Sequence, residues 1–299
     1  MSAGRSEAKS EVVWQPRGRV PERLCLYGPQ SCGKTKAIAD MLSAGIGPGQ
    51  TAYIVDTDNS WARFLEGGNY PKLEVRGEWE DGEWVDEWTV EGGRVVLLHV
   101  AGWDQFRFAM EYVWGEAARG DWVVIDSITH PWAEVASWYI EKVHGTELPD
   151  FMIQARMKQV STGKGADGGA GEMLVEWNFI NKEWNRAFLT PYVNAKCHVV
   201  VTAEAKTLRT DDRGDRKDVK DLYASVGMKP DTQRRVGANS QTVLYFEQGR
   251  VGRDVQWYVT TAKERERERL TRVDWTDVDF AKVYLWDVAG WRPKKMTNE

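Results

Sequence analysis

Short apolar runs alternate along the chain with stretches of helical periodicity. Runs of about four to eight apolar residues between turn residues predict buried strands, and apolar positions spaced three and four apart predict helices. The predicted strands are 23–28, 51–58, 94–100, 121–127 and 196–203. The predicted helices are 33–45, 104–120, 131–143 and 176–189. This alternation is typical of an α/β fold with a mainly parallel sheet covered by helices on both faces.

Two neighbouring runs near the C-terminus depart from the alternation. Residues 241–249 and 254–262 follow each other with only a short turn between them, which predicts an antiparallel hairpin at one edge of the sheet. No internal repeat and no domain boundary is evident. We therefore expect one α/β domain over 21–292, a flexible N-terminal arm over 1–20 and a tail over 293–299.

The composition is that of an ordinary soluble globular protein, with 299 residues of which 42% are hydrophobic and 28% charged. No uncharged apolar run reaches the roughly 18 residues of a membrane span, and the N-terminus lacks the apolar centre of a signal peptide. Cys25, Cys32 and Cys197 are far apart without metal-binding spacing. We expect a cytoplasmic protein with reduced cysteines and no membrane contact.

Charge is distributed unevenly, although the net charge is only −5. Residues 71–92 hold eight acidic and two basic residues, and we expect them to form an acidic surface insertion. Residues 205–235 hold nine basic and six acidic residues. Any contact with a polyanion should therefore be local and run through particular loops.

The octet "GPQSCGKT" matches the phosphate-loop pattern G-x-x-x-x-G-K-[S/T] without gaps. A predicted strand precedes it and a predicted helix follows it, which is the context that distinguishes such a loop from a chance match in a glycine-rich turn. Backbone N–H groups of the loop and the helix N-terminus would then face an anion. The predicted nucleotide-binding residues are Gly28, Pro29, Gln30, Ser31, Cys32, Gly33, Lys34 and Thr35.

Three residues are predicted to handle the charge of a bound nucleotide and its metal. Lys34 would neutralise the β- and γ-phosphates of ATP, and the Thr35 hydroxyl would ligate Mg²⁺. Asp126 stands at the end of the apolar run "DWVVIDS" and would hold the same Mg²⁺ through water. The alternative for Asp126 is a strand-end cap without contact to a metal.

Beyond the phosphate loop, four segments carry a resemblance to a known family: "YIVDTDNSWARFL", "VVIDSITHPW", "HVVVTAEAK" and "GMKPDTQRRVGANSQTVLYFEQG", the last of which looks like that family's stretch from a second DNA-binding loop into a terminal hairpin. Together with the octet they resemble RecA-like P-loop ATPases over about residues 22–265, and they are most similar to small phage-encoded RecA/RadA-type ATPases, including those assigned to single-strand annealing. The resemblance implies a RecA-like core with a C-terminal hairpin.

The resemblance also implies two further site residues. Asp58 takes the position of the family's Glu that polarises the attacking water, and Glu204 that of a polar sensor residue that is usually Gln. The Asp58 carboxylate is one methylene shorter, a departure that bears on the rate of hydrolysis and not on nucleotide binding. The alternative is that "DTDNS" simply forms an Asx turn.

RecA-like proteins hold single strands through two loops, which the resemblance places after Ser127 and after Glu204. Basic groups on glycine-rich loops can follow a phosphate backbone, and Tyr223 could stack on a base. The alternative is that these charged loops are only solvated. The candidate DNA-binding residues are Arg156, Lys158, Lys164, Lys206, Arg209, Arg213, Arg216 and Lys217.

The segment "TTAKERERERL" contains Lys263 and Arg265, which match a Lys-x-Arg pair in several hexameric RecA-like ATPases. In those proteins the pair reaches the γ-phosphate of the neighbouring subunit, where it can stabilise the charge of the transition state. The alternative is a solvated surface segment. The implied partners are single-stranded DNA, further copies of the chain in a ring or filament, and a single-strand-binding protein.

Two other residue types invite predictions. Cys32 lies at a helix N-terminus inside the phosphate loop, which predicts a lowered thiol pKa and alkylation that Mg-ATP blocks. The tryptophans, 16 in number, are predicted to be packing residues rather than base platforms. Those at helical positions are Trp61, Trp132, Trp138, Trp177 and Trp184.

Taken as a whole, the sequence favours a Mg²⁺-dependent ATPase that acts on single-stranded DNA in recombination, annealing or replication. A small-molecule or nucleoside kinase is the first alternative, with "RTDDRGDRK" as its lid. A nucleotide-gated scaffold with little turnover is the second, consistent with Asp58 in place of Glu.

Overall fold

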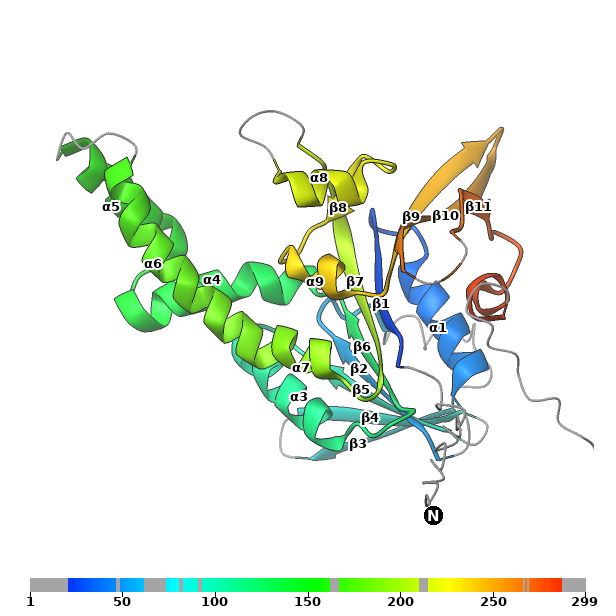
Figure 1. The fold of residues 1–299 in the computed structure, drawn as a ribbon. Helices are drawn as coiled ribbons and strands as arrows, with labels where there is room; N and C mark the ends of the chain where they lie inside the picture. The colour runs from blue at the N-terminus through cyan, green and yellow to red at the C-terminus, as the bar shows by residue number, and fades with distance from the viewer. Residues whose placement is uncertain are drawn as a thin grey trace, which may run out of the picture.

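One large sheet organises the chain in the computed structural model (Figure 1). The structure describes residues 21–46, 49–61, 74–80, 83–90, 93–161, 167–209, 215–265, 267 and 269–286. The strands follow the order β11-β10-β9-β1-β7-β6-β2-β5-β4-β3, and β8 pairs with β7 beside this path. Their bounds are β1 (Arg23–Gly28), β2 (Thr51–Asp56), β3 (Glu74–Glu80), β4 (Glu83–Val90), β5 (Gly93–His99), β6 (Trp122–Asp126), β7 (His198–Thr207), β8 (Met228–Pro230), β9 (Thr242–Val251), β10 (Asp254–Glu264) and β11 (Val273–Asp274).

The centre of the sheet is parallel and both edges are antiparallel. Six central strands pair in parallel with one another, in the order β9-β1-β7-β6-β2-β5. Strand β10 runs antiparallel to β9, as the hairpin prediction requires. The predicted α/β class, a mainly parallel sheet flanked by helices with a C-terminal antiparallel hairpin, is confirmed.

The second antiparallel edge was not expected from the sequence. Strands β3 and β4 lie within the acidic stretch 71–92, and β4 pairs antiparallel with β5. The described part of this stretch therefore extends the sheet, in contrast to the predicted surface insertion. Charged residues are common on strands at the edge of a sheet, where they discourage edge-to-edge association, so an acidic sequence is compatible with this position.

Helices cover both faces of the sheet (Figure 1). Helix α1 packs on one face, whereas α3, α4, α6 and α7 lie on the other. A π-helical turn over Asn185–Leu189 joins α6 to α7. The bounds of the helices are α1 (Lys34–Gly45), α3 (Trp103–Glu116), α4 (Thr129–His144), α5 (Leu148–Ser161), α6 (Asp167–Trp184), α7 (Thr190–Asn194), α8 (Lys217–Tyr223) and α9 (Arg235–Asn239).

The parallel strands are buried on both faces, which is why their sequences read as continuous apolar runs. Strand β6 shows this most clearly. Val123 and Ile125 join the core beneath α3 and α4, while Trp122 and Val124 join the core beneath α1. Full burial of one such aliphatic side chain contributes about 1.5–3 kcal/mol to stability. The two cores thus fix the carboxyl ends of the strands, where the candidate site lies.

Helices α5 and α6 form an arm that extends away from the sheet (Figure 1). Helix α6 begins at Asp167, whereas the sequence predicted a loop until residue 176. The helix is anchored farther along by Ile180 and Trp184, which are buried against the core, and it continues back through the glycine-rich residues. Among the described helices, none combines the length and the apolar character needed to cross a bilayer.

Candidate nucleotide-binding site

The octet forms the turn between β1 and α1, as its sequence context predicts. Gly28 ends β1 and Lys34 begins α1. A Cβ at Gly28 would lie 2.2 Å from the carbonyl oxygen of Phe246 in β9, so no larger residue fits there. Gly33 has a φ of +92°, and a Cβ on it would lie 2.8 Å from the ring of Trp275. Both glycines of the motif are therefore required by the geometry of the turn.

The segment 275–284 packs against helix α1, which follows the phosphate loop. Trp275, Phe280 and Tyr284 are buried and share one core with α1. The backbone N–H of Phe280 donates to the Asp40 carboxylate on α1 at 3.1 Å. Packing of this segment against α1 thus contributes to the position of the helix N-terminus that the phosphate loop leads into.

Lys34 turns its ammonium group back over the loop. The Nζ atom donates to the carbonyl oxygens of Gly28 at 3.0 Å and Pro29 at 2.8 Å. Among the described residues no carboxylate forms an ion pair with it. No described carboxylate therefore neutralises the positive charge at the mouth of the loop, which fits a site that receives a polyphosphate.

Asp126 is a buried carboxylate at the centre of the site, with only 2% of its surface exposed. Its Oδ2 atom accepts hydrogen bonds from the Thr35 hydroxyl and the Trp61 indole, both at 2.9 Å. The Thr202 hydroxyl donates to Oδ1. The pKa of Asp126 is raised to about 6, mainly by burial; the Asp58 and Asp56 carboxylates act in the same direction, and the hydrogen bonds from Thr202 and Thr35 oppose the shift.

The contact between Thr35 and Asp126 tests whether the site suits Mg²⁺. A hydroxyl and a carboxylate side by side are ligands that Mg²⁺ accepts, with the remaining positions left to water and phosphate oxygens. In the described part of the chain no group of three or more His, Cys, Asp or Glu residues could hold a metal by itself. The Thr35 hydroxyl and the Asp126 carboxylate fit two of the ligand types that Mg²⁺ accepts.

The turn after β2 holds two further carboxylates with different environments. Asp56 is buried and accepts the backbone N–H groups of Ser60 and Trp61, each at 3.2 Å. Asp58 is exposed and accepts the N–H of Ser60 at 3.0 Å. Partial desolvation and the Asp56 carboxylate raise the pKa of Asp58. The Asx turn considered for "DTDNS" is thus present, and it orients the Asp58 carboxylate.

Thr57 joins this turn to the end of β6, a link that no sequence pattern predicted. Its backbone N–H donates to the Asp126 carbonyl at 2.8 Å, and its hydroxyl donates to the Ser127 carbonyl at 2.7 Å. The same hydroxyl accepts the N–H of Ser127 at 2.9 Å. The Thr57 carbonyl lies 3.3 Å from Nδ1 of His130. Thr57 therefore fixes the spacing between Asp58 and Asp126.

Glu204 lies beside the phosphate loop, at the position predicted for a sensor. It is the register partner of Gly28 in the β1–β7 pair. The amide nitrogen of Gln30 donates to its carboxylate at 3.0 Å. Glu204 can therefore respond to a change in the loop through Gln30.

Cys32 does not have the lowered thiol pKa that the sequence predicted. The residue is fully buried, with 0% of its surface exposed. Burial raises the pKa of the thiol and outweighs the opposing effect of Lys34, whose ammonium lies 3.6 Å from the sulfur. The prediction of a lowered pKa is wrong, because desolvation dominates over the helix N-terminus here, whereas alkylation that Mg-ATP blocks stays a prediction.

Lys263 and Arg265 lie near the amino end of strand β9 and donate hydrogen bonds to carbonyl groups of their own chain. The Lys263 ammonium donates to the carbonyl oxygens of Gly237, Ala238 and Ser240 at 2.6–3.0 Å. Arg265 donates to the Ala238 carbonyl at 2.9 Å. A contact of Lys263 with a neighbouring subunit would require these bonds to break, whereas Arg265 is exposed and has one such bond.

Two candidate DNA-binding residues are placed differently from the prediction. Arg156 and Lys158 lie on helix α5 instead of in a loop, because the helix continues to Ser161. Lys164 and Arg213 lie outside the described residues. The first predicted DNA-binding loop is therefore mainly helical where it is described.

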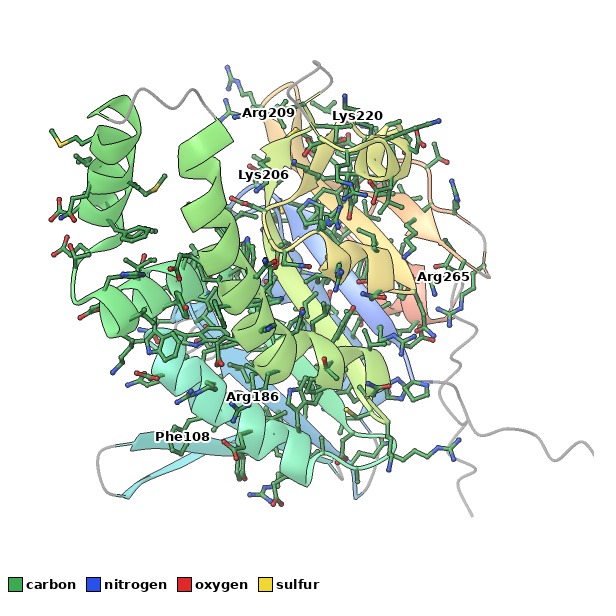
Figure 2. The ribbon with its side chains drawn as sticks, turned by 60° about the vertical axis from the view of Figure 1, so that its left-hand side comes forward. Phe108, Arg186, Lys206, Arg209, Lys220 and Arg265 are labelled. Atoms are coloured by element: carbon green, nitrogen blue, oxygen red, sulfur yellow. The ribbon has the colours of Figure 1, made fainter. Side chains whose placement is uncertain are left out.

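The candidates after Glu204 share one end of the molecule. Lys206 and Arg209 are close together at this end in Figure 2, far from Arg265. Lys206 forms an ion pair with Asp231, and Arg216 lies 3.4 Å from Asp218. Lys217 is exposed at the start of α8. The basic residues are thus partly neutralised, as the mixed sequence suggested.

The aromatic predictions have mixed outcomes. Tyr223 is only 3% exposed and packs edge-to-face on Tyr27, so its predicted stacking on a base is wrong. Trp61 and Trp184 are buried, as predicted, whereas Trp177 is 39% exposed. Trp132 and Trp138 are partly buried against the core.

Comparison with known proteins gives similar structures but no sequence relative. No model of a protein family matches the chain, and no curated protein matches it. The RadB recombinase structure is 14% identical, with a TM-score of 0.43 and coverage of 85% of this chain and 87% of that chain. The KaiC-like protein PH0186 from Pyrococcus horikoshii OT3 is 12% identical, with a TM-score of 0.41 and coverage of 86% and 87%. The roles of individual residues rest on the geometry of the site itself.

Proposed function

We propose that the chain binds ATP with Mg²⁺ and hydrolyses it. The observation that carries the proposal is the arrangement of Lys34, Thr35 and Asp126. An unneutralised ammonium stands at a phosphate loop, and a hydroxyl 2.9 Å from a buried carboxylate stands next to it. This set provides one partner for phosphate charge and two for a divalent metal.

Each residue has a distinct task in this proposal. Lys34 exchanges its loop carbonyls for phosphate oxygens, and Thr35 and Asp126 hold the metal, Asp126 through water. Bound Mg²⁺ neutralises developing charge on the phosphates. Asp58 orients the attacking water at the rim of the site, because it is the exposed carboxylate nearest to Asp126 in the turn that Thr57 fixes. Glu204 responds to the conformation of the phosphate loop through its hydrogen bond with Gln30.

The proposed setting is single-stranded DNA in recombination, annealing or replication, in a cytoplasm. The basic residues after Glu204 would contact the strand, with copies of the chain assembled as a ring or filament and a single-strand-binding protein as a further partner. A phage-encoded type is proposed on the resemblance alone. Arg265 is the proposed residue for contact with a neighbouring nucleotide.

One observation favours a second candidate, a nucleotide-gated scaffold. The Asp58 carboxylate is short and accepts a hydrogen bond from Ser60 at 3.0 Å, which restrains its reach toward a bound nucleotide. Such a protein would bind ATP tightly and release phosphate very slowly. Binding and turnover must therefore be measured separately.

Equilibrium binding of a fluorescent ATP analogue, with Mg²⁺ or with EDTA, tests the proposal, and phosphate release in the same samples separates the two candidates. The Lys34→Ala variant should lose nucleotide affinity by about a hundredfold, since it removes the charge that faces the phosphates. The exposed Lys142 on α4 provides the matched control, Lys142→Ala, which should bind like the wild type. Equal affinity in Lys34→Ala and wild type would refute the proposed site.

A further inference from the structure

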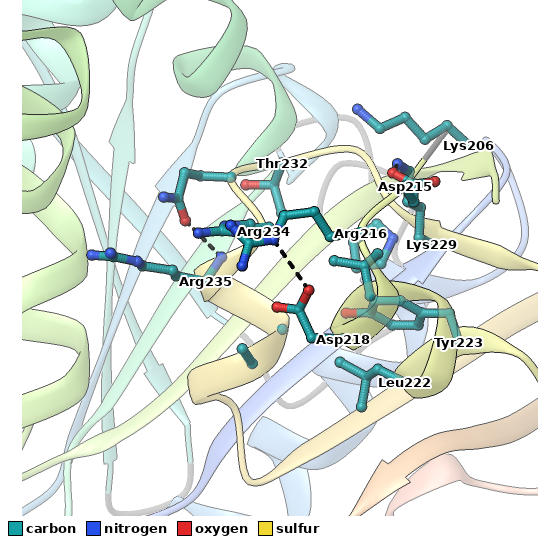
Figure 3. A pocket seen from close by; sticks show the side chains of 15 residues that line it. Lys206, Asp215, Arg216, Asp218, Leu222, Tyr223, Lys229, Thr232, Arg234 and Arg235 are labelled. Atoms are coloured by element: carbon teal, nitrogen blue, oxygen red, sulfur yellow. Dashed lines mark hydrogen bonds and ion pairs between the residues drawn. The ribbon is translucent and has the colours of Figure 1, made fainter. Parts of the chain in front are cut away.

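A second pocket lies between α8 and α9, on β8 and the end of β7 (Figure 3). Its volume is about 420 Å³, within the range of about 300–1,000 Å³ that small-ligand sites occupy. Five basic and two acidic side chains line it. The basic residues are Lys206, Arg216, Lys229, Arg234 and Arg235. The pocket therefore has an excess of positive charge and suits an anionic ligand.

Ion pairs neutralise only part of this charge. Lys206 pairs with Asp231, Lys229 with Asp215, and Arg216 lies 3.4 Å from Asp218. Arg234 and Arg235 are exposed, and no carboxylate within the described ranges pairs with either guanidinium. In Figure 3 Arg234 lies among Thr232, Arg216 and Asp218, whereas Arg235 extends away from them. Arg234 is thus the cation available to a ligand inside the pocket.

Thr232 adds an independent indication of a ligand. Only 8% of the residue is exposed, and its hydroxyl oxygen is buried without a hydrogen-bond partner among the described residues. Buried hydroxyls nearly always have a partner, so an orphan that lines a pocket points to a group that enters it. The Thr232 hydroxyl can donate to an anionic oxygen. Thr232 is two residues before Arg234 in the sequence.

The opposite side of the pocket is apolar. Val219 and Leu222 of α8 and Pro230 of β8 line it. A ligand that uses both sides needs a flat, weakly polar part and an anionic part. A nucleotide has both, in its base and its phosphate.

We propose that this pocket binds one nucleotide unit, with the phosphate at Arg234 and Thr232 and the base against Leu222. The shared chemistry is a nucleoside monophosphate, which either a residue of single-stranded DNA or a free nucleotide can supply. The inference deepens the proposed DNA contact but is separate from the phosphate loop. It gives roles to Thr232 and Arg234, which the sequence did not single out.

The test compares three variants by fluorescence anisotropy with a labelled oligo(dT) and by calorimetry with dTMP. Arg234→Ala should weaken binding about tenfold or more, because it removes a charge-assisted contact to phosphate. Thr232→Val keeps the shape and removes only the hydroxyl, and it should weaken binding severalfold without lowering the melting temperature. Arg250→Ala, at an exposed position of β9, is the control and should bind like the wild type.

The calorimetry uses the Lys34→Ala background, so that the phosphate loop does not take up dTMP. Loss of oligo(dT) binding in Arg234→Ala and Thr232→Val identifies the ligand as DNA, and loss confined to dTMP identifies it as a free nucleotide. Unchanged binding of both probes in both variants overturns the inference. The proposed ATPase would survive that result, because its own test depends on Lys34 and not on this pocket.

Discussion

The Asp126→Asn substitution separates the stability of the fold from the function of the site. Asparagine has the shape of the carboxyl group and no charge. Its oxygen can accept from Thr35 and Trp61 where Oδ2 does now, and its amide can donate to the Thr202 hydroxyl, which can rotate to accept. Each hydrogen bond that Asp126 now accepts therefore has a counterpart in the variant, which should fold.

The magnitude follows from the pKa of Asp126, which burial raises from its ordinary 3.8 to about 6. A raised pKa means that the folded state holds the proton more tightly than the unfolded state. Ionisation of the unfolded chain therefore removes stability as the pH rises from about 4 through about 6. The full effect is about 3 kcal/mol above that window and about 1 kcal/mol at pH 4.5, since one pKa unit corresponds to about 1.4 kcal/mol. Asp126→Asn should recover that stability.

Thermal unfolding in EDTA, without nucleotide, at pH 7.5 and pH 4.5 measures the effect. At pH 7.5 the melting temperature of Asp126→Asn should exceed that of the wild type by roughly 5–10 °C, and the difference should shrink to about a third at pH 4.5. Mg²⁺-dependent turnover should be lost at the same time. Asp121→Asn is the control, because the Asp121 carboxylate accepts backbone N–H groups of Thr51 and Ala118 and its neutralisation should destabilise the fold. An Asp126→Asn variant less stable than wild type at pH 7.5 would refute the reasoning.

Substitutions at three further positions test the other parts of the site. Asp58→Asn should bind ATP like the wild type and lose at least tenfold in phosphate release, and normal release would exclude its role with water. Thr57→Val should reduce turnover severalfold at unchanged ATP affinity, and Thr57→Ser should restore it, whereas failure of Thr57→Ser to restore turnover would argue against the hydroxyl. Arg265→Ala should bind ATP without hydrolysis, and mixing it with Lys34→Ala should recover some activity if subunits share sites. No recovery in intact assemblies would leave Arg265 at the surface of its own subunit.

The sequence was sufficient for the parts of the molecule that rest on local patterns. The parallel strands are buried on both faces, so their apolar runs were visible, and the octet contains its own turn chemistry in Gly28 and Gly33. Asp126 could be located because it ends such a run. The pattern therefore predicted the sheet, the terminal hairpin and the phosphate loop.

What the sequence could not provide depends on contacts between distant segments. The acidic strands β3 and β4 resemble a solvated loop, because only the pairing of β4 with β5 and of β3 with β4 makes them strands. Thr57 acts through Ser127 and His130, about 70 residues away in the sequence. The burial of Cys32 and Tyr223 reversed two predictions, since local sequence does not show which polar group loses contact with water.

Steady-state phosphate release from Mg-ATP, with and without single-stranded DNA, tests the central claim most directly. The wild type should release phosphate in a Mg²⁺-dependent reaction that single-stranded DNA stimulates, while Lys34→Ala should show only the background rate under both conditions. Phosphate release by Lys34→Ala at the wild-type rate would contradict the account, because the activity would then come from somewhere other than the phosphate loop.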